Sequence, residues 1–224
     1  FTFDEDGEQI SLRYDLSVPL SRFYSQNYLT LPNPYKRYQI AESVFRREKP
    51  GSGRYKAFGQ CDCDIIGNFN SSIANAELCN LIASTLLNCG LKKNQFIINI
   101  SNRKIVQGLI EDLKISEDKK IKVMRAIDKL DKPGFGLRGV EDLLKKERVD
   151  VSGAVTKGAD LTDDQASQII NFLKVKDLKE LKENLKNPLS QEGIKELEDL
   201  LEIASYGDYL DQIKTNFTIV RGLA

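Results

Sequence analysis

Hydrophobic and polar positions divide the chain into a strand-rich beginning and a helix-rich remainder. Over residues 1–67, short runs in which apolar and polar positions alternate predict strands at Phe1–Asp6, Gln9–Tyr14 and Tyr35–Arg47, with a turn at Gly7. Between them, Val18–Asn27 carries its large apolar residues at helical spacing, which predicts a helix. The first part of the chain is therefore predicted to be a sheet with at least one helix.

The middle of the chain continues with a helix, a strand and another helix. Ala74–Cys89 has a wide apolar stripe at helical spacing and is predicted as a helix. Gln95–Ser101, with the sequence QFIINIS, is predicted as a short strand. The pattern becomes helical again from Arg103.

From about Ile110 the composition shifts to Lys, Glu, Asp and Leu, and aromatic residues become scarce. Thr162–Gln165 has the sequence of a capping box. Three helical faces follow it: Ala166, Ile169, Ile170 and Leu173; Leu178, Leu181 and Leu185; Ile194, Leu197 and Leu201. We predict a small all-helical domain over residues 110–213, with faces that are solvated or contact RNA. Phe217–Val220 (FTIV) is predicted as a strand that returns to the first domain, which thus comprises residues 1–109 and 214–224.

The charge balance limits how the chain can bind anions. It has 33 basic and 33 acidic residues, so its formal net charge is zero and no global positive field attracts nucleic acid. Any anion must therefore be bound by a local cluster. The longest apolar runs are short and interrupted, so neither a membrane span nor a signal peptide is expected, and no membrane partner.

Cysteine and histidine usage excludes several kinds of chemistry. The four cysteines, Cys61, Cys63, Cys79 and Cys89, form no C-x-x-C pair, and the chain contains no histidine. Zinc binding and thiol–imidazole catalysis therefore lack their usual groups, and we expect no protein-bound metal. The cysteines are interpreted as buried, reduced thiols. A reaction catalysed here has to depend on positioning and electrostatics.

The stretch VFRREKPGSGRYKAFGQCDCD, residues 44–64, predicts a hairpin around a glycine-rich basic loop. Arg46 and Arg54 supply guanidinium groups for carboxylate or phosphate oxygens. Phe58 can stack on a planar base, and Glu48 can accept from an exocyclic amine. These groups would suit a nucleoside triphosphate held without a Walker-type loop. The alternative is an ordinary solvated hairpin tip.

The returning strand places three polar side chains on one face. Gln60, Asp62 and Asp64 alternate, so all three point to the same side. Two carboxylates on a buried floor need a cation opposite, and an ammonium, an imidazole N–H or a metal would serve. Alternatively, the carboxylates pair with neighbouring arginines.

Three segments carry a resemblance to a known family. The hairpin resembles motif 2 of class II aminoacyl-tRNA synthetases in its histidyl-tRNA synthetase form; the matching residues are Phe45, Arg46, Glu48, Pro50, Gly53, Arg54, Tyr55, Phe58, Gln60 and Asp64. Lys56 replaces the usual arginine of that motif. LRYDLSVP (residues 12–19) and VRGL (residues 220–223) are similar to two further family segments, and IDKLDK (residues 127–132) is similar to part of the insertion of this family.

The resemblance implies an α/β fold, with an antiparallel sheet flanked by helices and interrupted by the helical insertion. It implies a ligase that activates L-histidine with ATP and transfers it to tRNA(His), in a cytoplasmic homodimer, with Mg²⁺ bound through the ATP phosphates. Arg46 and Arg221 would be the catalytic arginines. ATP would contact Arg46, Glu48, Arg54 and Phe58, and histidine would contact Asp15, Ser17, Arg46, Gln60, Asp64 and Arg221. Asp15, Ser17 and Gln60 would hold the α-amino group, and Asp64 would meet the imidazole.

Departures from the family pattern leave other interpretations open. The motif 1 segment, the paired tyrosines after VRGL, motif 3 and the anticodon-binding domain are absent from the sequence, which is interpreted as a catalytic-core fragment. One rival is a non-catalytic relative, of the kind that serves as the regulatory subunit of ATP phosphoribosyltransferase or senses uncharged tRNA in a kinase. Arg46, Arg54 and Arg221 favour an enzyme, since a binding module needs no arginine at a transition-state charge. A helical scaffold with a basic hairpin is a third interpretation.

Overall fold

A computed structural model describes residues 2–49, 51–132, 134–149 and 155–220 of the chain. The fold is mixed α/β, as the sequence predicts, and the chain divides into two compact units, Phe1–Ala74 and Asn75–Ala224. Each unit is described by itself below. None of the helices in the described ranges combines the length and the apolar character needed to cross a membrane.

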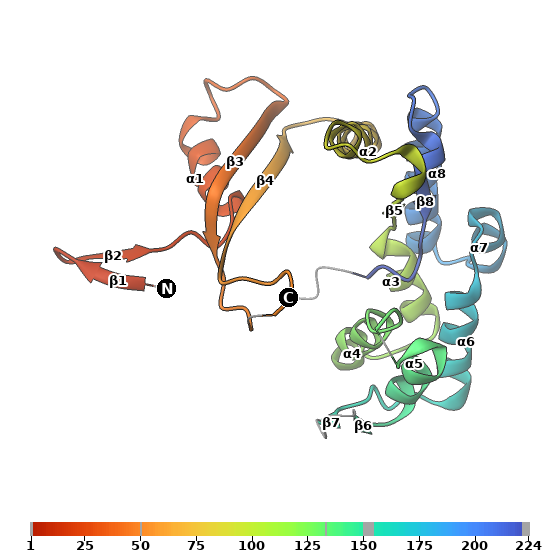
Figure 1. The fold of residues 1–224 in the computed structure, drawn as a ribbon. Coiled ribbons are helices and arrows are strands. Elements are labelled where there is room, and N and C mark those ends of the chain that lie inside the picture. The colour runs from red at the N-terminus through yellow and green to blue at the C-terminus, as the bar shows by residue number, and fades with distance from the viewer. Residues whose placement is uncertain (1, 50, 133, 150–154, 221–224) are drawn as a thin grey trace. The chain divides into compact units, whose positions relative to one another are not determined.

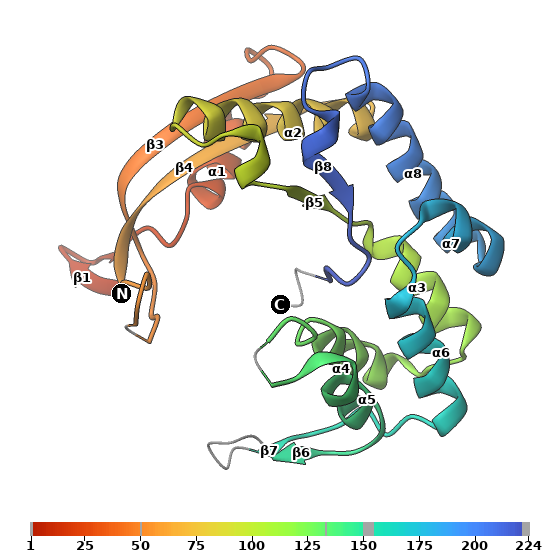
Figure 2. The same ribbon diagram turned by 45° about the vertical axis from the view of Figure 1, so that its right-hand side comes forward.

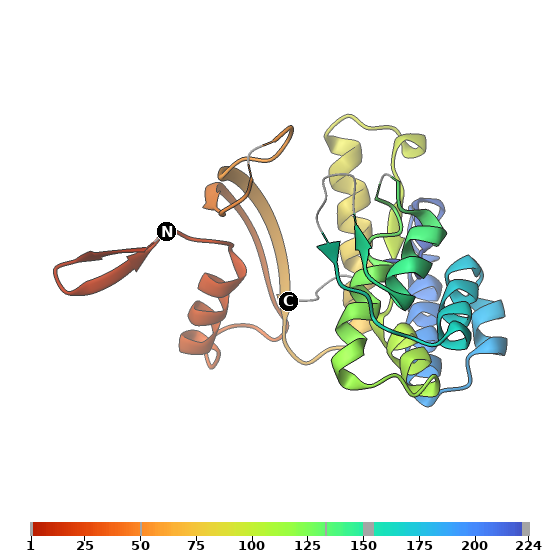
Figure 3. The same cartoon turned by 90° about the horizontal axis from the view of Figure 1, so that it is seen from below.

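The first unit begins with a small antiparallel hairpin around the predicted turn, although its second strand ends at Ser11 rather than at Tyr14. Strands β1 (Thr2–Glu5) and β2 (Glu8–Ser11) pair in register and meet at a turn where Gly7 has a φ of 81°. Glycine suits this position because side chains disfavour positive φ. All residues of both strands are exposed, and the hairpin projects away from the rest of the unit (Figures 1 and 3).

Helix α1 (Ser17–Asn27) leads to a long ribbon of two antiparallel strands, β3 (Tyr35–Phe45) and β4 (Ala57–Ile66). The predicted helix and strand are confirmed, and β3 ends at Phe45 rather than at residue 47. A small core of Leu16, Ala41 and Val44, with Phe58 packed against it, lies on one face of the ribbon.

The β3–β4 ribbon contains a bulge that the sequence did not reveal. Ala41 pairs with Gln60, whereas Val44 pairs with Phe58, so β3 uses three steps where β4 uses two. Because side chains alternate along a strand, this extra residue changes which positions of β3 share a face with Gln60. Odd-numbered residues share it before the bulge, and even-numbered residues share it afterwards.

The second unit contains a parallel strand pair packed between helices. β5 (Ile98–Ile100) pairs in parallel with β8 (Ile213–Thr215). Both strands share a core with the helices α2 (Ser71–Asn88) and α8 (Pro188–Ala204), and this core includes Ala83, Ile98 and Ala204. Figure 2 shows β5 and β8 side by side. Short 3-10 turns at Lys93–Gln95 and Leu210–Gln212 precede the two strands. The predicted strand at Gln95–Ser101 is therefore present but shorter, and its parallel partner was not anticipated.

Between β5 and α8 in the sequence, the described residues form the helices α3 (Arg103–Asp112), α4 (Glu117–Ile127), α5 (Gly136–Lys145), α6 (Asp163–Lys174) and α7 (Leu178–Asn184). They share a large apolar core that includes Ile110, Leu144, Ile169 and Ile194. The capping box is confirmed at the start of α6, where the Thr162 hydroxyl accepts from the Gln165 N–H at 3.2 Å. The region is not all-helical, however, because Arg148–Val149 (β6) and Val155–Thr156 (β7) form a short hairpin.

Two further predictions are wrong. The strand expected at Phe217–Val220 is a turn: the Asn216 side chain accepts from the Thr218 N–H and hydroxyl at 3.1 and 2.6 Å, which competes with strand pairing, while Phe217 is buried in the helical core. The thiols are not all buried either. Only Cys79 is buried, and Cys63 is half-buried. Cys61, on β4, and Cys89, just after the end of α2, are exposed.

The domain boundary expected near Ile110 falls inside α3. The two compact units divide earlier in the chain, between Ala74 and Asn75. The proposal that a catalytic domain of residues 1–109 and 214–224 is interrupted by an insertion at 110–213 stays a prediction.

Candidate functional site

The predicted site residues of the first unit gather along the β3–β4 ribbon, beginning with Arg46. Its guanidinium lies 4.8 Å from the centre of the Tyr14 ring and 5.2 Å from that of Phe58. Its Nε also donates to the Tyr14 carbonyl at 3.2 Å. Two aromatic rings and the bond to the Tyr14 carbonyl hold the planar cation in one orientation. Arg46 is thus a positioned fork suited to an anionic oxygen.

The hairpin beyond Arg46 opens and then closes in a tight turn. The Arg46 N–H donates to the Lys56 carbonyl at 2.9 Å, and Gly51 and Arg54 exchange two backbone hydrogen bonds of 3.2 and 3.0 Å. Gly53 occupies the turn with a φ of 69°, a conformation that favours glycine. Residues 51–53 (GSG) therefore make a short tip that carries Arg54 next to the strands.

A hollow of about 260 Å³ lies under this tip, lined by Glu48, Gly53, Arg54, Tyr55 and Phe58. The Arg54 guanidinium is 3.8 Å from the Glu48 carboxylate, and the two side chains are 74% and 39% exposed. Such an exposed pair is weak and can be opened by a ligand. Sites for drug-sized ligands measure roughly 300–1,000 Å³, so this hollow fits a single ring system rather than a whole nucleotide.

The acidic face of the ribbon begins below Phe58. The Gln60 amide donates to Asp62 Oδ1 at 3.5 Å, the long limit for such a bond. Asp64 Oδ2 accepts from Arg37 Nη2 at 2.7 Å, and their side chains are 22% and 15% exposed. Arg37 lies directly opposite Asp64 in the strand register. One carboxylate of this face is therefore neutralised by a neighbouring arginine, the alternative that the sequence left open.

Asp15 and Ser17 reach the same region through the start of α1. The Asp15 carboxylate accepts from the Val18 N–H at 3.0 Å and so caps the first turn of the helix. Arg37 Nη2, which binds Asp64, also donates to the Leu16 carbonyl at 3.1 Å. This guanidinium thereby fixes the segment of residues 15–17 beside the Asp64 end of the ribbon.

The bulge is what places both halves of this site on one face. Before it, Arg37 and Ala41 face the same side as Asp64 and Gln60; after it, Val44 shares that side with Phe58. Arg46 follows Val44 by two positions and contacts Phe58 as well. Without the extra residue, alternation would turn Arg46 to the side opposite Gln60.

The structure adds two residues that sequence reasoning did not assign, Tyr14 and Arg37. Tyr14 lies within the LRYDLSVP segment and directly precedes the predicted Asp15, so an aromatic residue inside that segment was the available signal. Arg37 could have been found by pairing β3 with β4 across the hairpin. Arg221, the predicted second catalytic arginine, lies outside the described residues.

A nucleophilic role for the nearby cysteine is disfavoured. Burial is the largest cause that raises the pKa of the Cys63 thiol, and the charges of Cys61, Asp62 and Asp64 raise it further. The thiol is therefore neutral near pH 7, and a thiolate is the nucleophilic form. This agrees with a site that acts by positioning.

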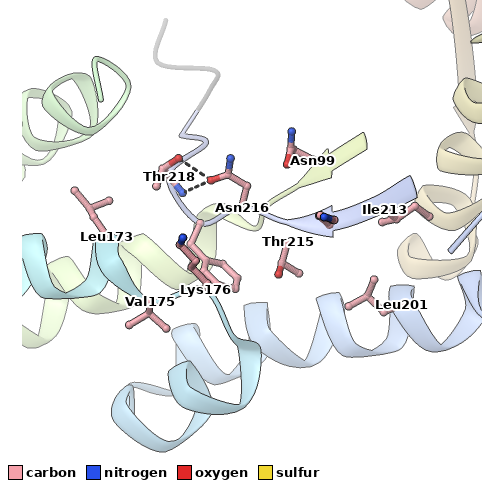
Figure 4. A pocket seen from close by; sticks show the side chains of 11 residues that line it. Asn99, Leu173, Val175, Lys176, Leu201, Ile213, Thr215, Asn216 and Thr218 are labelled. Carbon is pink, nitrogen blue, oxygen red and sulfur yellow. Dashed lines mark hydrogen bonds between the residues drawn. The ribbon is translucent and has the colours of Figure 1, made fainter. Parts of the chain in front are cut away.

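Described residues of the second unit line two hollows that are larger than the one at the hairpin tip. One, of about 540 Å³, lies between the end of β8, the α6–α7 connection and α8, and Figure 4 shows its lining, including Leu173, Lys176, Leu201 and Thr215. The other, of about 550 Å³, is strongly basic: its lining contains Lys122, Arg125, Lys129, Lys132 and Lys157, with Asp128 as the only acidic residue among the lining residues. We call the second hollow the basic groove.

Comparison with known proteins places these features in a family. A family model described as histidyl-tRNA synthetase matches residues 2–151. The chain is 81% identical over 224 residues to a protein of Pelagibacter ubique named histidine--tRNA ligase, covering 100% of this chain and 48% of that protein. It is 41% identical to a protein of the same name from Bartonella bacilliformis, covering 98% of this chain and 46% of that one. The chain spans about half the length of the curated relatives it matches.

Solved structures give the same result. Histidyl-tRNA synthetase from Nostoc sp. PCC 7120 superposes with a TM-score of 0.81 at 26% identity, over 100% of this chain and 49% of that one. A Bacillus halodurans structure described as an ATP phosphoribosyltransferase regulatory subunit/histidyl-tRNA synthetase superposes with a TM-score of 0.79 at 17% identity, over 100% of this chain and 54% of that one. The second likeness concerns the fold alone.

Proposed function

Because the chain belongs to the histidyl-tRNA synthetase family, we propose that it carries the amino-acid activation site of a ligase that joins L-histidine to tRNA(His). The observation that carries this proposal is the arrangement of Arg46 between Tyr14 and Phe58, next to the hollow of Glu48 and Arg54. The 81% identical relative favours the ligase over a regulatory module.

ATP would bind along the hairpin. The adenine would stack on Phe58 and donate its exocyclic amine to Glu48, which lines the hollow at the hairpin tip. Arg54 would leave its weak pair with Glu48 to contact the distal phosphates, and Arg46 would contact the α-phosphate. Guanidinium forks suit phosphate oxygens in both cases.

The reaction needs no protein base. The histidine carboxylate is ionised near neutral pH, so its oxygen attacks the α-phosphorus directly, the bond from that phosphorus to the bridging oxygen breaks, and pyrophosphate leaves. Histidyl-adenylate remains. A hydroxyl of the tRNA 3′ end then attacks its carbonyl carbon, the bond from that carbon to the phosphate oxygen breaks, and AMP leaves, with the hydroxyl proton passing to a phosphate oxygen of the departing AMP. Arg46 aligns carboxylate and phosphate and neutralises the charge that develops between them, and Arg221 is proposed to do the same.

Magnesium is proposed to bind with ATP. Within the described ranges, no group of three acidic, cysteine or histidine side chains is placed to hold a metal ion. Bound to the phosphates, the ion would neutralise part of their charge. The arginine-rich hairpin fits a metal ion that is held by ATP rather than by the protein, because it offers hydrogen-bond donors to phosphate and few oxygen ligands for a metal.

Histidine-dependent exchange of pyrophosphate into ATP tests the activation step, using the protein at the full length of its relatives. We expect exchange in the unaltered protein and a loss of about 10²- to 10³-fold in kcat for Arg221→Ala. Asp64→Asn should raise the KM for histidine more than the KM for ATP. Absence of histidine-dependent exchange in the unaltered protein would overturn the proposed function, whereas full activity of Arg221→Ala would overturn the role of that arginine.

For tRNA, we infer that the basic groove binds the phosphate backbone. The chain has no net positive charge, so local clusters must provide the attraction. The lining of this groove contains five basic side chains and one carboxylate. It lies within the predicted insertion, for which the sequence left an RNA contact open.

Charge reversal tests this interaction. Arg125→Glu and Lys132→Glu should weaken tRNA binding and reduce its salt dependence by about one counterion for each phosphate that the variant no longer binds. Pyrophosphate exchange, which needs no tRNA, should be unchanged. Lys195→Glu is the matched control, because Lys195 is exposed on α8 and does not line the groove. Equal weakening by the control would remove the groove from the proposal. We also propose, as the family resemblance implies, that the full-length protein is a cytoplasmic homodimer.

A further inference from the structure

A second carboxylate on the acidic face has no counterpart in the roles assigned so far. Asp62 lies between Gln60 and Asp64 on β4, and Gln39 is its partner across the ribbon. Unlike Asp64, it forms no ion pair among the described residues, and its Oδ2 is shielded from water without a hydrogen-bond donor. An ionised oxygen in such a position costs free energy until a donor reaches it.

Gln60 has an unpaired acceptor beside it. Because its amide NH₂ faces the Asp62 carboxylate, its carbonyl Oε1 points elsewhere, and this oxygen is also shielded and unpaired. Gln60 and Asp62 are both half-buried, so part of each side chain remains accessible on the face that also carries Arg37 and Phe58. Rotation about the last bond of an aspartate is soft, so either carboxylate oxygen can turn toward a ligand.

The arginine end of the same face has the opposite character. Arg37 Nε is a shielded donor without a partner, next to the Asp64 carboxylate. The face thus offers two acceptors at one end, and a donor beside a carboxylate at the other. A neutral imidazole has one donor and one acceptor, whereas an ammonium has three donors and no acceptor.

We propose that Asp62, together with Gln60, binds the α-ammonium of the amino-acid substrate. This proposal rests on the proposed function. Asp62 supplies the negative charge that Gln60 lacks, and it also orients the Gln60 amide so that the carbonyl oxygen is presented to the ammonium. The imidazole is then left to the Asp64 end, where its acceptor nitrogen can meet Arg37.

Binding of three related ligands to the full-length protein tests this assignment. The ligands are L-histidine, histidinol, which keeps the ammonium and lacks the carboxylate, and 3-(imidazol-4-yl)propionate, which lacks the ammonium. Asp62→Asn should weaken histidine and histidinol by about tenfold to a hundredfold and leave the propionate nearly unchanged. Asp64→Asn should weaken all three, because each carries the imidazole.

Stability separates a binding role from a structural one. Because the half-buried Asp62 carboxylate has no ion pair, Asp62→Asn should leave the melting temperature of the ligand-free protein equal or higher, while the increase caused by histidine shrinks. Asp4→Asn, on the exposed strand β1, is the control and should change neither quantity.

Three results would overturn the assignment. They are unchanged histidine binding in Asp62→Asn, equal weakening of all three ligands, which would place the imidazole on Asp62, and a lowered melting temperature with ligand binding intact. Failure of the unaltered protein to bind histidine would instead contradict the proposed function from which this assignment starts.

Discussion

Arg37 and Asp64 lie opposite each other on the β3–β4 ribbon, and the Arg37 guanidinium donates to the Asp64 carboxylate at 2.7 Å. Both side chains are less than a quarter exposed. Replacing Arg37 by Met leaves a half-buried carboxylate without its cation and also removes the bond to the Leu16 carbonyl. We expect Arg37→Met to lower the free energy of unfolding by about 2–3 kcal/mol, measured by denaturant titration.

The double variant Arg37→Met/Asp64→Asn serves as its control. If the pair is the cause, the double variant should recover part of the stability, because the uncompensated charge is gone. Strictly additive losses would show that Arg37 stabilises the ribbon by other interactions.

Arg46 is expected to depend on its planar shape as well as its charge. Lysine keeps the charge but cannot stack between Tyr14 and Phe58 or present a fork. Arg46→Lys should reduce kcat/KM for ATP in pyrophosphate exchange by about 10- to 100-fold with little change in melting temperature. Arg47→Lys is the matched control, since the neighbouring Arg47 is exposed, and it should behave like the unaltered protein. Equal effects of the two changes would contradict a special role for the stack.

Gly108 allows α3 and α8 to approach closely. A methyl group at this position would collide with the Ser190 hydroxyl and lie 2.7 Å from the Ser190 backbone nitrogen. The buried Ser190 hydroxyl meanwhile donates to the Ile105 carbonyl at 3.0 Å, so it cannot move without losing that bond. Gly108→Ala should therefore lower the free energy of unfolding by about 1–3 kcal/mol despite the better helix propensity of alanine. Gly51→Ala, where no atom lies within 4 Å, should change stability little.

Acid is expected to loosen the packing of α3 on α8 through Glu196. Burial acts to raise the pKa of this carboxyl, but hydrogen bonds from Lys104 and Asn102 outweigh burial and lower it. A lowered folded-state pKa means that stability is present above the unfolded value, near 4.5, and is lost as the pH falls through the folded value. Thermal unfolding from pH 6 to pH 3 should show a smaller acid-induced loss for Glu196→Gln. Because the Glu196 side chain is 34% exposed, the difference should not exceed about 1 kcal/mol. Identical pH profiles would rule out this contribution.

Much of the fold could be predicted from periodicity and caps. The helices at Ser17–Asn27 and Ser71–Asn88 and the Thr162–Gln165 box follow from local patterns, which is why they were found. The FTIV segment was misread because its apolar residues suit a strand, while the Asn216 side chain imposes a turn. Parallel pairing of β5 with β8 joins residues more than a hundred positions apart, and no local pattern encodes it.

The site was predicted from motif residues rather than from spatial neighbours. Arg46, Glu48, Arg54 and Phe58 do gather at the hairpin, because they are close in the sequence and the turn at Gly53 brings them together. Tyr14 and Arg37 were missed since their roles depend on register and on a chain segment laid against β3. Their interactions become evident only when the strands are paired.

The extra residue between Ala41 and Val44 has a consequence for protein engineering. A design that moves this ribbon into another scaffold, or shortens it by one position, has to preserve the irregularity along with the residues proposed to contact ligands. A design that copied all of these residues into a regular pair of strands would place some of them on one face and the rest on the other. We expect such a design to be inactive, although its sequence would match the motif at every position.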